Sequence, residues 1–285
     1  MKSKVVYAKI GLDWQKIKLV FGGLMILLTG ASGFVGSSIL GMRDDLVIAP
    51  SLRGLSEDEI KRIIEESSAD TVIHTAAISD IGVCSANPDA SYKANVLLPI
   101  HIARASAGRK LICFSSDQVY SGSSFDGPYS EDMAKPGNIY AEHKLEMENR
   151  VLDILPSAVM LRAEWMYGYY HRKSNYLMNI INAKDKISFS SSQYRGITYI
   201  KEVAESMESV IRLPGGVYNF GSETTKSIYE ITREFLSLIG KDIELCEAEP
   251  RHNLWMNCSK ASDLGVKFSS VEDGLKRCAQ DCKLI

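Results

Sequence analysis

Two side chains suited to proton transfer, Tyr140 and Lys144, lie four residues apart in the segment YAEHK. Residues at this spacing share one face of a helix, so the phenol and the ammonium can point into the same cleft. A nearby cation favours the phenolate and draws the pKa of a tyrosine down from about 10. Such a tyrosine can protonate a carbonyl oxygen while hydride reaches the carbonyl carbon. Because YxxxK pairs also occur by chance, a solvated helix face is the other interpretation.

A hydroxyl stands upstream of this pair, at Ser116, directly after a predicted strand over residues 110–115. Open parallel sheets bind ligands outside the carboxyl ends of their strands. We therefore expect Ser116 to face the same cleft as Tyr140 and Lys144. The order of a glycine turn, a strand-end serine and YxxxK is more specific than any of its parts.

The glycine turn has the sequence TGASGFVG and lies between an apolar run at 25–29 and a predicted helix at 33–40. The first glycine permits a tight turn, the second lets backbone N–H groups approach a pyrophosphate, and the third lets the helix pack closely. The helix N-terminus then faces the phosphates. A glycine triplet alone often marks only a turn. Here we predict dinucleotide binding by Gly30, Ser32, Gly33, Phe34, Val35 and Gly36.

The second predicted strand, at 46–49, runs into Arg53 with no Asp or Glu to bind a ribose 2′-hydroxyl. Arg53 could instead meet a 2′-phosphate, which favours NADP(H) and leaves NAD(H) as the alternative. A solvated surface arginine is the other interpretation. We also expect Ala76 and Ala77 to contact the cofactor.

Alternating elements must position these residues. Strands are predicted at 25–29, 46–49, 71–75, 110–115, 159–162 and 216–220, and helices at 33–40, 56–66, 88–107 and 140–155. This alternation predicts an α/β fold, a doubly wound parallel sheet of Rossmann type. We expect a Rossmann domain at 25–165, with 196–221 returning to it. Residues 166–195 and 222–277 would form a smaller, C-terminal substrate-binding lobe.

The first 24 residues stand apart, because Met25 begins an apolar strand that suits the start of a nucleotide-binding fold. We hypothesise that residues 1–24 are a translated leader, or alternatively a disordered or loosely docked tail. The apolar run 19–28 is ten residues long, whereas a membrane span needs about 20. We therefore expect no membrane segment.

Composition excludes several classes of protein. The 285 residues are 45% hydrophobic and 24% charged, with a net charge of −2, which is ordinary for a globular chain. Nothing suggests a surface for polyanions, so we expect no nucleic-acid partner. The six cysteines form no CxxC pair, which favours free thiols in a reducing cytoplasmic compartment. Neither HxH nor HExxH occurs, so we expect no metal.

Residues 25 to about 280 resemble an extended short-chain dehydrogenase/reductase, and within that group the dTDP-4-dehydrorhamnose reductase family. Segment 115–120, SSDQVY, is similar to the family's STDxVF; segment 138–144, NIYAEHK, to NxYGxxK; and segment 162–167, RAEWMY, to RTSWVY. Segments 193–198 and 251–257 are similar to the family's DQxGxPT and RPxxSxLD/N.

The resemblance implies that Ser116 polarises the substrate carbonyl, that Tyr140 is the general acid, and that Lys144 anchors the ribose and activates Tyr140. It implies NADPH-dependent reduction of the 4-keto group of a nucleotide-activated deoxysugar, as in dTDP-rhamnose biosynthesis, and allows a homodimer. The expected substrate contacts are Asp117, Gln118, Trp165 and Arg251.

Departures from the family's motifs leave the sugar nucleotide open. Gln118 stands in place of a common tyrosine, Ala141 in place of a glycine, and Ile197 in place of a proline. One alternative is a non-catalytic regulatory subunit that binds NADP or a sugar nucleotide, as in methionine adenosyltransferase. Another is an NAD-retaining epimerase or dehydratase, although Asp117 and Gln118 lack the Asp-Glu pair that is common in dehydratases.

Overall fold

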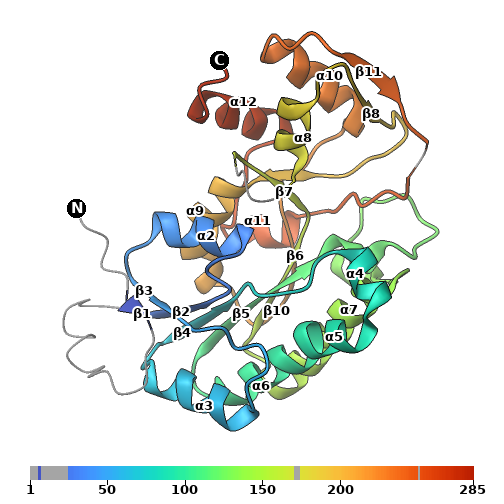
Figure 1. The fold of residues 1–285 in the computed structure, drawn as a ribbon. Helices are drawn as coiled ribbons and strands as arrows, with labels where there is room; N and C mark the ends of the chain where they lie inside the picture. The colour runs from blue at the N-terminus through green and yellow to red at the C-terminus, as the bar shows by residue number, and fades with distance from the viewer. Residues whose placement is uncertain (1–5, 8–24, 170–173, 250) are drawn as a thin grey trace.

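The computed structural model describes residues 6–7, 25–169, 174–249 and 251–285 (Figure 1). Its centre is a seven-stranded sheet in the order β1-β3-β2-β4-β5-β6-β10, in which all neighbours are parallel. The strands are β1 (Val6–Tyr7), β2 (Ile26–Thr29), β3 (Leu46–Ile48), β4 (Thr71–His74), β5 (Lys110–Ser116), β6 (Val159–Ala163) and β10 (Gly216–Phe220). The six strands predicted from the sequence are all present, and the fold is the expected α/β fold of Rossmann type.

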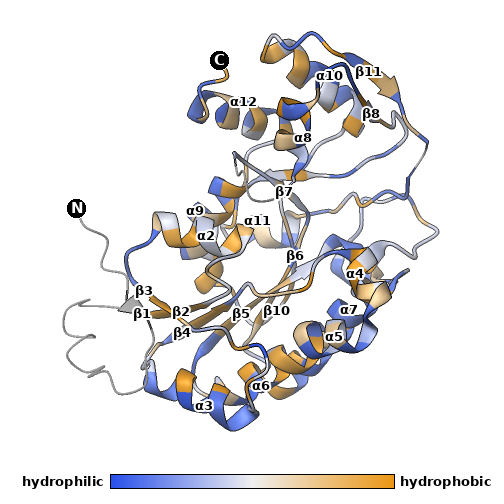
Figure 2. Ribbon diagram, viewed as in Figure 1, coloured by the Kyte–Doolittle hydropathy of each residue, from blue (hydrophilic) through white to orange (hydrophobic). Residues whose placement is uncertain are grey.

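The strands of the central sheet are largely continuous apolar segments, because helices cover both faces of the sheet (Figure 2). Successive side chains point to opposite faces. Accordingly, Ile26 and Leu28 belong to one hydrophobic cluster, and Met25 and Leu27 belong to another on the opposite face. Helices α2 and α9 pack together, and α6 contacts both α3 and α7. The helices next to the sheet are α2 (Phe34–Met42), α3 (Glu57–Glu66), α6 (Leu98–Ala105), α7 (Ile139–Ile154) and α9 (Ile200–Ile211).

The single long helix predicted over 88–107 was wrong in detail. The structure has α5 (Pro88–Tyr92), a π-helix (Lys93–Leu97) and then α6, and a further helix, α4 (Ile81–Ala86), precedes them. The π-helix holds the buried Asn95, whose amide accepts from Ile78 N at 3.0 Å and donates to Ile78 O at 2.9 Å. Apolar periodicity does not distinguish a π turn from an α turn, so only the structure shows this clamp on the loop after β4.

A smaller lobe covers one end of the sheet (Figure 1). It contains two parallel strand pairs, β7 with β9 and β8 with β11, and further helices. Their bounds are β7 (Trp165–Tyr167), α8 (Tyr176–Asn182), β8 (Lys186–Phe189), β9 (Ile197–Tyr199), α10 (Ile228–Leu238), β11 (Glu244–Glu247) and α12 (Val271–Asp281). Helix α11 (Ser259–Asp263) instead contacts β10 of the central sheet. Short 3₁₀ turns lie at Asp117–Tyr120 and Glu131–Met133.

At the N-terminus, Val6 and Tyr7 pair with Val47 and Ile48 at the edge of the sheet. The rest of residues 1–24, and with it the leader hypothesis, lies outside the described residues. Within the described part of the chain, no helix combines the length and apolar character needed to cross a membrane. All six cysteines are free thiols.

Candidate active site

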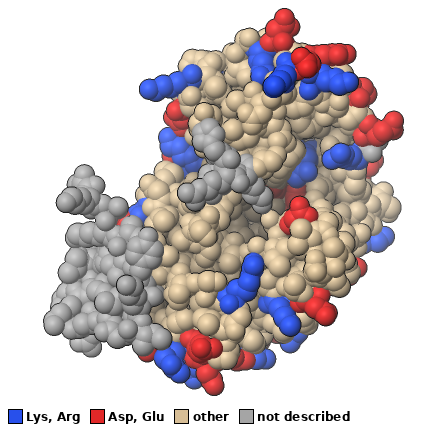
Figure 3. All heavy atoms as spheres, viewed as in Figure 1, with Lys and Arg blue, Asp and Glu red and all other residues tan. Residues whose placement is uncertain are grey.

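A cavity of about 1430 Å³ lies at the carboxyl ends of the central strands. Figure 3 shows a hollow between the half that carries the sheet and the half that carries the smaller lobe, with acidic and basic side chains interspersed around it. From β2 the chain continues to β3 on one side and returns to β4 on the other. Such a switch of direction opens a crevice in which α/β sheets bind ligands.

The glycine turn forms one wall of the cavity. Gly30 has φ +76°, and a Cβ there would lie 2.6 Å from Ala76 N, so only glycine fits. A Cβ on Gly36 would lie 2.2 Å from Gly30 O, which shows how closely α2 packs on the turn. Among the described residues, no side chain caps α2 at Gly33. The N-terminus of α2 borders the cavity, and a helix N-terminus favours an anion such as a dinucleotide pyrophosphate.

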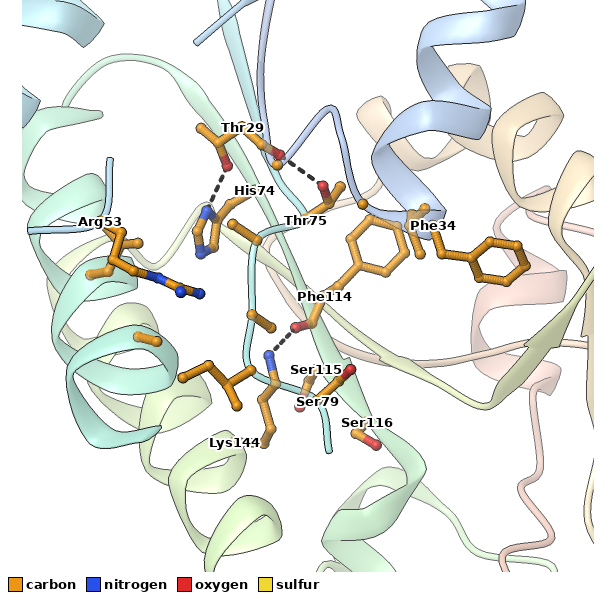
Figure 4. Close-up of a pocket in the computed structure, with 18 of the residues that line it drawn as sticks. Thr29, Phe34, Arg53, His74, Thr75, Ser79, Phe114, Ser115, Ser116 and Lys144 are labelled. Carbon is orange, nitrogen blue, oxygen red and sulfur yellow. Dashed lines mark hydrogen bonds between the residues drawn. The ribbon is translucent and has the colours of Figure 1, made fainter. Parts of the chain in front are cut away.

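Side chains from the ends of β2 and β4 form the floor beside this turn (Figure 4). The Thr29 hydroxyl lies 2.7 Å from His74 Nδ1, and the Thr75 hydroxyl donates to Thr29 O at 2.7 Å. Burial, followed by the charge of Lys144, lowers the pKa of His74 to about 3, so the imidazole is neutral. Its buried Nε2 has no hydrogen-bond partner within the described residues. His74 as a residue also lines the cavity.

The structure brings Ser116, Tyr140 and Lys144 to one cavity, as the sequence order predicted. Ser116 ends β5, and its hydroxyl donates to Asp117 Oδ1 at 3.1 Å while accepting from Gln118 N at 3.2 Å. Tyr140 and Lys144 occupy the first turns of α7, which begins after the capping side chain of Asn138. Lys144 Nζ lies 5.9 Å from the centre of the Tyr140 ring.

Burial dominates the electrostatics of this group. It lowers the pKa of Lys144 to about 8. It raises the pKa of Tyr140, a shift that the Ser116 hydroxyl opposes and the charge of Asp117 increases. The sequence predicted the opposite direction for Tyr140, from the nearby cation. The prediction was wrong because removing the phenol from water penalises the phenolate more than its neighbours favour it. Tyr140 therefore keeps its proton, as a general acid must.

The predicted cofactor contacts also border the cavity. Ser32, Phe34, Val35, Ala76 and Ala77 line it, whereas the buried Gly36 supports the turn from behind. Arg53, beyond β3, is exposed and also lines the cavity, and Figure 4 shows its guanidinium on the same side of the pocket as His74.

The opposite wall carries the predicted substrate contacts, with one exception. Asp117, Gln118 and Trp165 line the cavity. Arg251 is exposed and lies outside the lining residues, so its role stays a prediction without geometric support.

Two further residues of this wall were missed in the sequence. Arg195 pairs with Asp117 at 2.8 Å and lies 5.1 Å from the centre of the Trp165 ring. Glu164 is buried between Ala163 and Trp165 and also lines the cavity. Glu164 stands where the resembling motif RTSWVY has serine, and this difference was the available signal.

A family model described as RmlD substrate binding domain matches residues 24–267. The chain belongs to this family. The resemblance drawn from the motifs is thus confirmed at the level of this family, with which an extended short-chain dehydrogenase/reductase is consistent.

Proteins that are similar to this chain carry names for different roles. The methionine adenosyltransferase 2 subunit beta of Xenopus laevis is 28% identical over 278 residues, which cover 84% of this chain and 82% of that protein. A dTDP-4-dehydrorhamnose reductase of Mycobacterium tuberculosis is 30% identical over 197 residues, 64% of each chain. The crystal structure of a dTDP-4-dehydrorhamnose reductase of Bacillus anthracis in complex with NADP has a TM-score of 0.80 at 20% identity. It covers 90% of this chain and 99% of that one, and it shows the shared fold.

Proposed function

We propose that this protein is an NADP(H)-dependent reductase of the 4-keto group of a nucleotide-activated deoxysugar. The observation that carries the proposal is the position of Ser116, Tyr140 and Lys144 in one cavity with the glycine turn. The names of the Mycobacterium tuberculosis and Bacillus anthracis relatives support the substrate class, and the NADP in the latter structure supports the cofactor.

The cavity fits the parts of NADP(H) one by one. The N–H groups at the start of α2 and the turn at Gly30 would hold the pyrophosphate. Arg53 would pair with the 2′-phosphate through its fork of donors. Lys144 would reach the nicotinamide ribose, since its ammonium lies beside the carboxyl end of β5.

The cofactor, when bound, supplies hydride to the carbonyl carbon. The Ser116 hydroxyl would turn from Asp117 to donate a hydrogen bond to the carbonyl oxygen. The Tyr140 phenol would donate its proton to the same oxygen as negative charge develops there, so the product is an alcohol. The positive charge of Lys144 would then stabilise the phenolate that remains. Two donors aimed at one oxygen give stabilisation of the oxyanion-hole kind.

The test is a panel of 4-keto sugars linked to dTDP, UDP, GDP and CDP, each mixed with NADPH and the protein. Loss of NADPH absorbance together with a reduced sugar product is the expected result for at least one member. NADPH binding without oxidation across the whole panel would contradict the proposal.

A second candidate, a non-catalytic regulatory subunit, is supported by one observation. The Xenopus laevis methionine adenosyltransferase 2 subunit beta matches 84% of this chain, against 64% for the Mycobacterium tuberculosis reductase. This candidate predicts that the protein binds NADPH without turnover and co-elutes with a methionine adenosyltransferase catalytic subunit in gel filtration. Sugar-nucleotide reduction without co-elution would exclude it.

A further inference from the structure

The inference concerns Glu164, a buried acid that the proposed reaction does not use. Glu164 follows Ala163, which is paired in register with Ser116, so it lies beside the reacting end of the cavity. Glu164 is 5% exposed and lines that cavity. An acid in such a position is costly to bury unless the fold is built to receive it.

The backbone around Glu164 is built for its carboxyl group. A Cβ on Gly196 would lie 2.0 Å from Glu164 Oε2, and a Cβ on Gly221 would lie 2.3 Å from Glu164 Cδ. Two segments distant in sequence therefore use glycine to leave room for this one side chain. The Thr198 hydroxyl donates to Glu164 Oε1 at 2.5 Å, and Ser222 N donates to the same oxygen at 2.9 Å. The carboxyl group is consequently held in one position.

The charges that face Glu164 come from the surrounding segments. They are Asp117 after β5 and Arg195 before β9, and the buried thiol of Cys258 lies near as well. Asp117 and Arg195 already form an ion pair of 2.8 Å, so their charges balance. Burial, together with the charge of Asp117, outweighs the hydrogen bonds from Thr198 and Ser222 and the charge of Arg195, and the pKa of Glu164 rises to about 8. At neutral pH this wall is thus electrically neutral, and above about pH 8 it carries one extra negative charge.

We infer that Glu164 is a specificity-determining residue that favours sugars without a charged group and disfavours sugars that bear a carboxylate. The inference rests on the proposed function, in which a carbonyl of the sugar lies at Ser116, and on the position of Trp165 and Glu164 in the same cavity. A carboxylate there would meet Asp117 and Glu164, while Arg195 is already engaged. Discrimination against the acidic sugar must therefore increase as Glu164 loses its proton.

The binding test uses dTDP-glucose and dTDP-glucuronate, and the same pair with UDP, which differ only in a sugar carboxylate. Dissociation constants are measured by calorimetry from about pH 6 to about pH 9, a range that brackets the titration of Glu164. For the wild type, the ratio of the glucuronate constant to the glucose constant should rise about tenfold over this range. In Glu164→Gln the rise should be clearly smaller, and what remains of it is due to Lys144, whose ammonium lines the same cavity and also titrates near pH 8. Glu244→Gln, an exposed glutamate on β11, is the matched control and should behave as the wild type.

A ligand-free measurement keeps the test decisive. An unfolded glutamate has a pKa of about 4.3, so between that pH and about pH 8 the folded state holds a proton that the unfolded state lacks. The wild type must then lose stability relative to Glu164→Gln as pH rises to about 8, and the difference must stay constant above it. Glu164→Ser, which carries the residue of the related motif, provides a second variant.

The inference would be overturned if the difference in Tm between the wild type and Glu164→Gln did not change with pH. It would also be overturned if the ratio of the glucuronate to the glucose dissociation constant had the same pH dependence in both proteins. Absence of NADPH oxidation with every 4-keto sugar would instead contradict the proposed function. The two failures are therefore distinguishable.

Discussion

Lys144 Nζ donates a 2.7 Å hydrogen bond to the carbonyl oxygen of Phe114 (Figure 4). This contact joins α7, which carries Tyr140, to β5, which ends in Ser116. A second buried contact joins the same two elements, because the Ser115 hydroxyl donates to Glu148 Oε1 at 2.5 Å. The groups expected to act on one carbonyl oxygen are thus held by rigid elements rather than by loops, as a preorganised site requires.

Replacement of Tyr140 by phenylalanine should lower turnover while leaving NADPH affinity near that of the wild type. The variant loses the proton donor but keeps the ring that fills a buried position. General acid catalysis contributes about 10²- to 10⁴-fold, so kcat should fall by that factor. Steady-state kinetics and NADPH titration check the two parts. Turnover equal to that of the wild type would refute the role of Tyr140.

Reduction should slow as pH rises through about 8, because Lys144 then loses the charge that stabilises the Tyr140 phenolate. Stability should change in the opposite direction. An unfolded lysine has a pKa of about 10.4, so between about pH 8 and that value the unfolded state binds a proton that the folded state lacks. The wild type should therefore gain stability with pH relative to Lys144→Met. Activity as a function of pH and thermal unfolding of both proteins measure these trends. If the stabilities of the wild type and Lys144→Met change with pH in the same way between about pH 8 and about pH 10, the lowered pKa of Lys144 is contradicted.

Alanine substitutions on α2 should differ sharply in their effect on stability. Gly36→Ala forces a Cβ to 2.2 Å from Gly30 O and should cost about 1–3 kcal/mol in the free energy of unfolding. Gly41→Ala, on the same helix with no atom within 4 Å of the new Cβ, should be neutral or stabilising by up to about 1 kcal/mol. Denaturant unfolding of the two variants gives the comparison. Equal stabilities would show that the packing of α2 on the turn is not tight.

Arg53→Ala should raise the KM for NADPH about tenfold, equivalent to about 1.4 kcal/mol, and leave the KM for NADH nearly unchanged. The reason is that only NADPH carries a 2′-phosphate for the guanidinium. Because Arg53 is exposed, the preference of the wild type for NADPH should weaken as salt is added. Kinetics with each cofactor at two ionic strengths test this. A parallel loss for both cofactors would place Arg53 elsewhere than at the 2′-phosphate.

Much of the architecture follows from the sequence alone. Apolar runs located six strands of the central sheet to within one residue, because a parallel strand covered on both faces needs consecutive apolar side chains, whereas β1 and the short strands of the smaller lobe were not predicted. Helical spacing placed Tyr140 and Lys144 on one helix, and strand-end chemistry placed Ser116 near them. These features depend on residues close together in the chain, whose geometry is nearly independent of the rest of the fold.

The tertiary structure decided what depends on distant contacts and on exclusion of water. Asp117 and Arg195, which form an ion pair, are 78 residues apart in the sequence, and Thr198 and Glu164, which share a hydrogen bond, are 34 apart. No local sequence pattern therefore predicts either contact. Burial reversed the expected direction of the Tyr140 pKa, because desolvation is set by what covers a side chain and not by its neighbours in sequence. The tertiary fold also decides the position of Arg251. Its guanidinium could bind an anionic substrate, but the residue lies on the exposed surface outside the cavity.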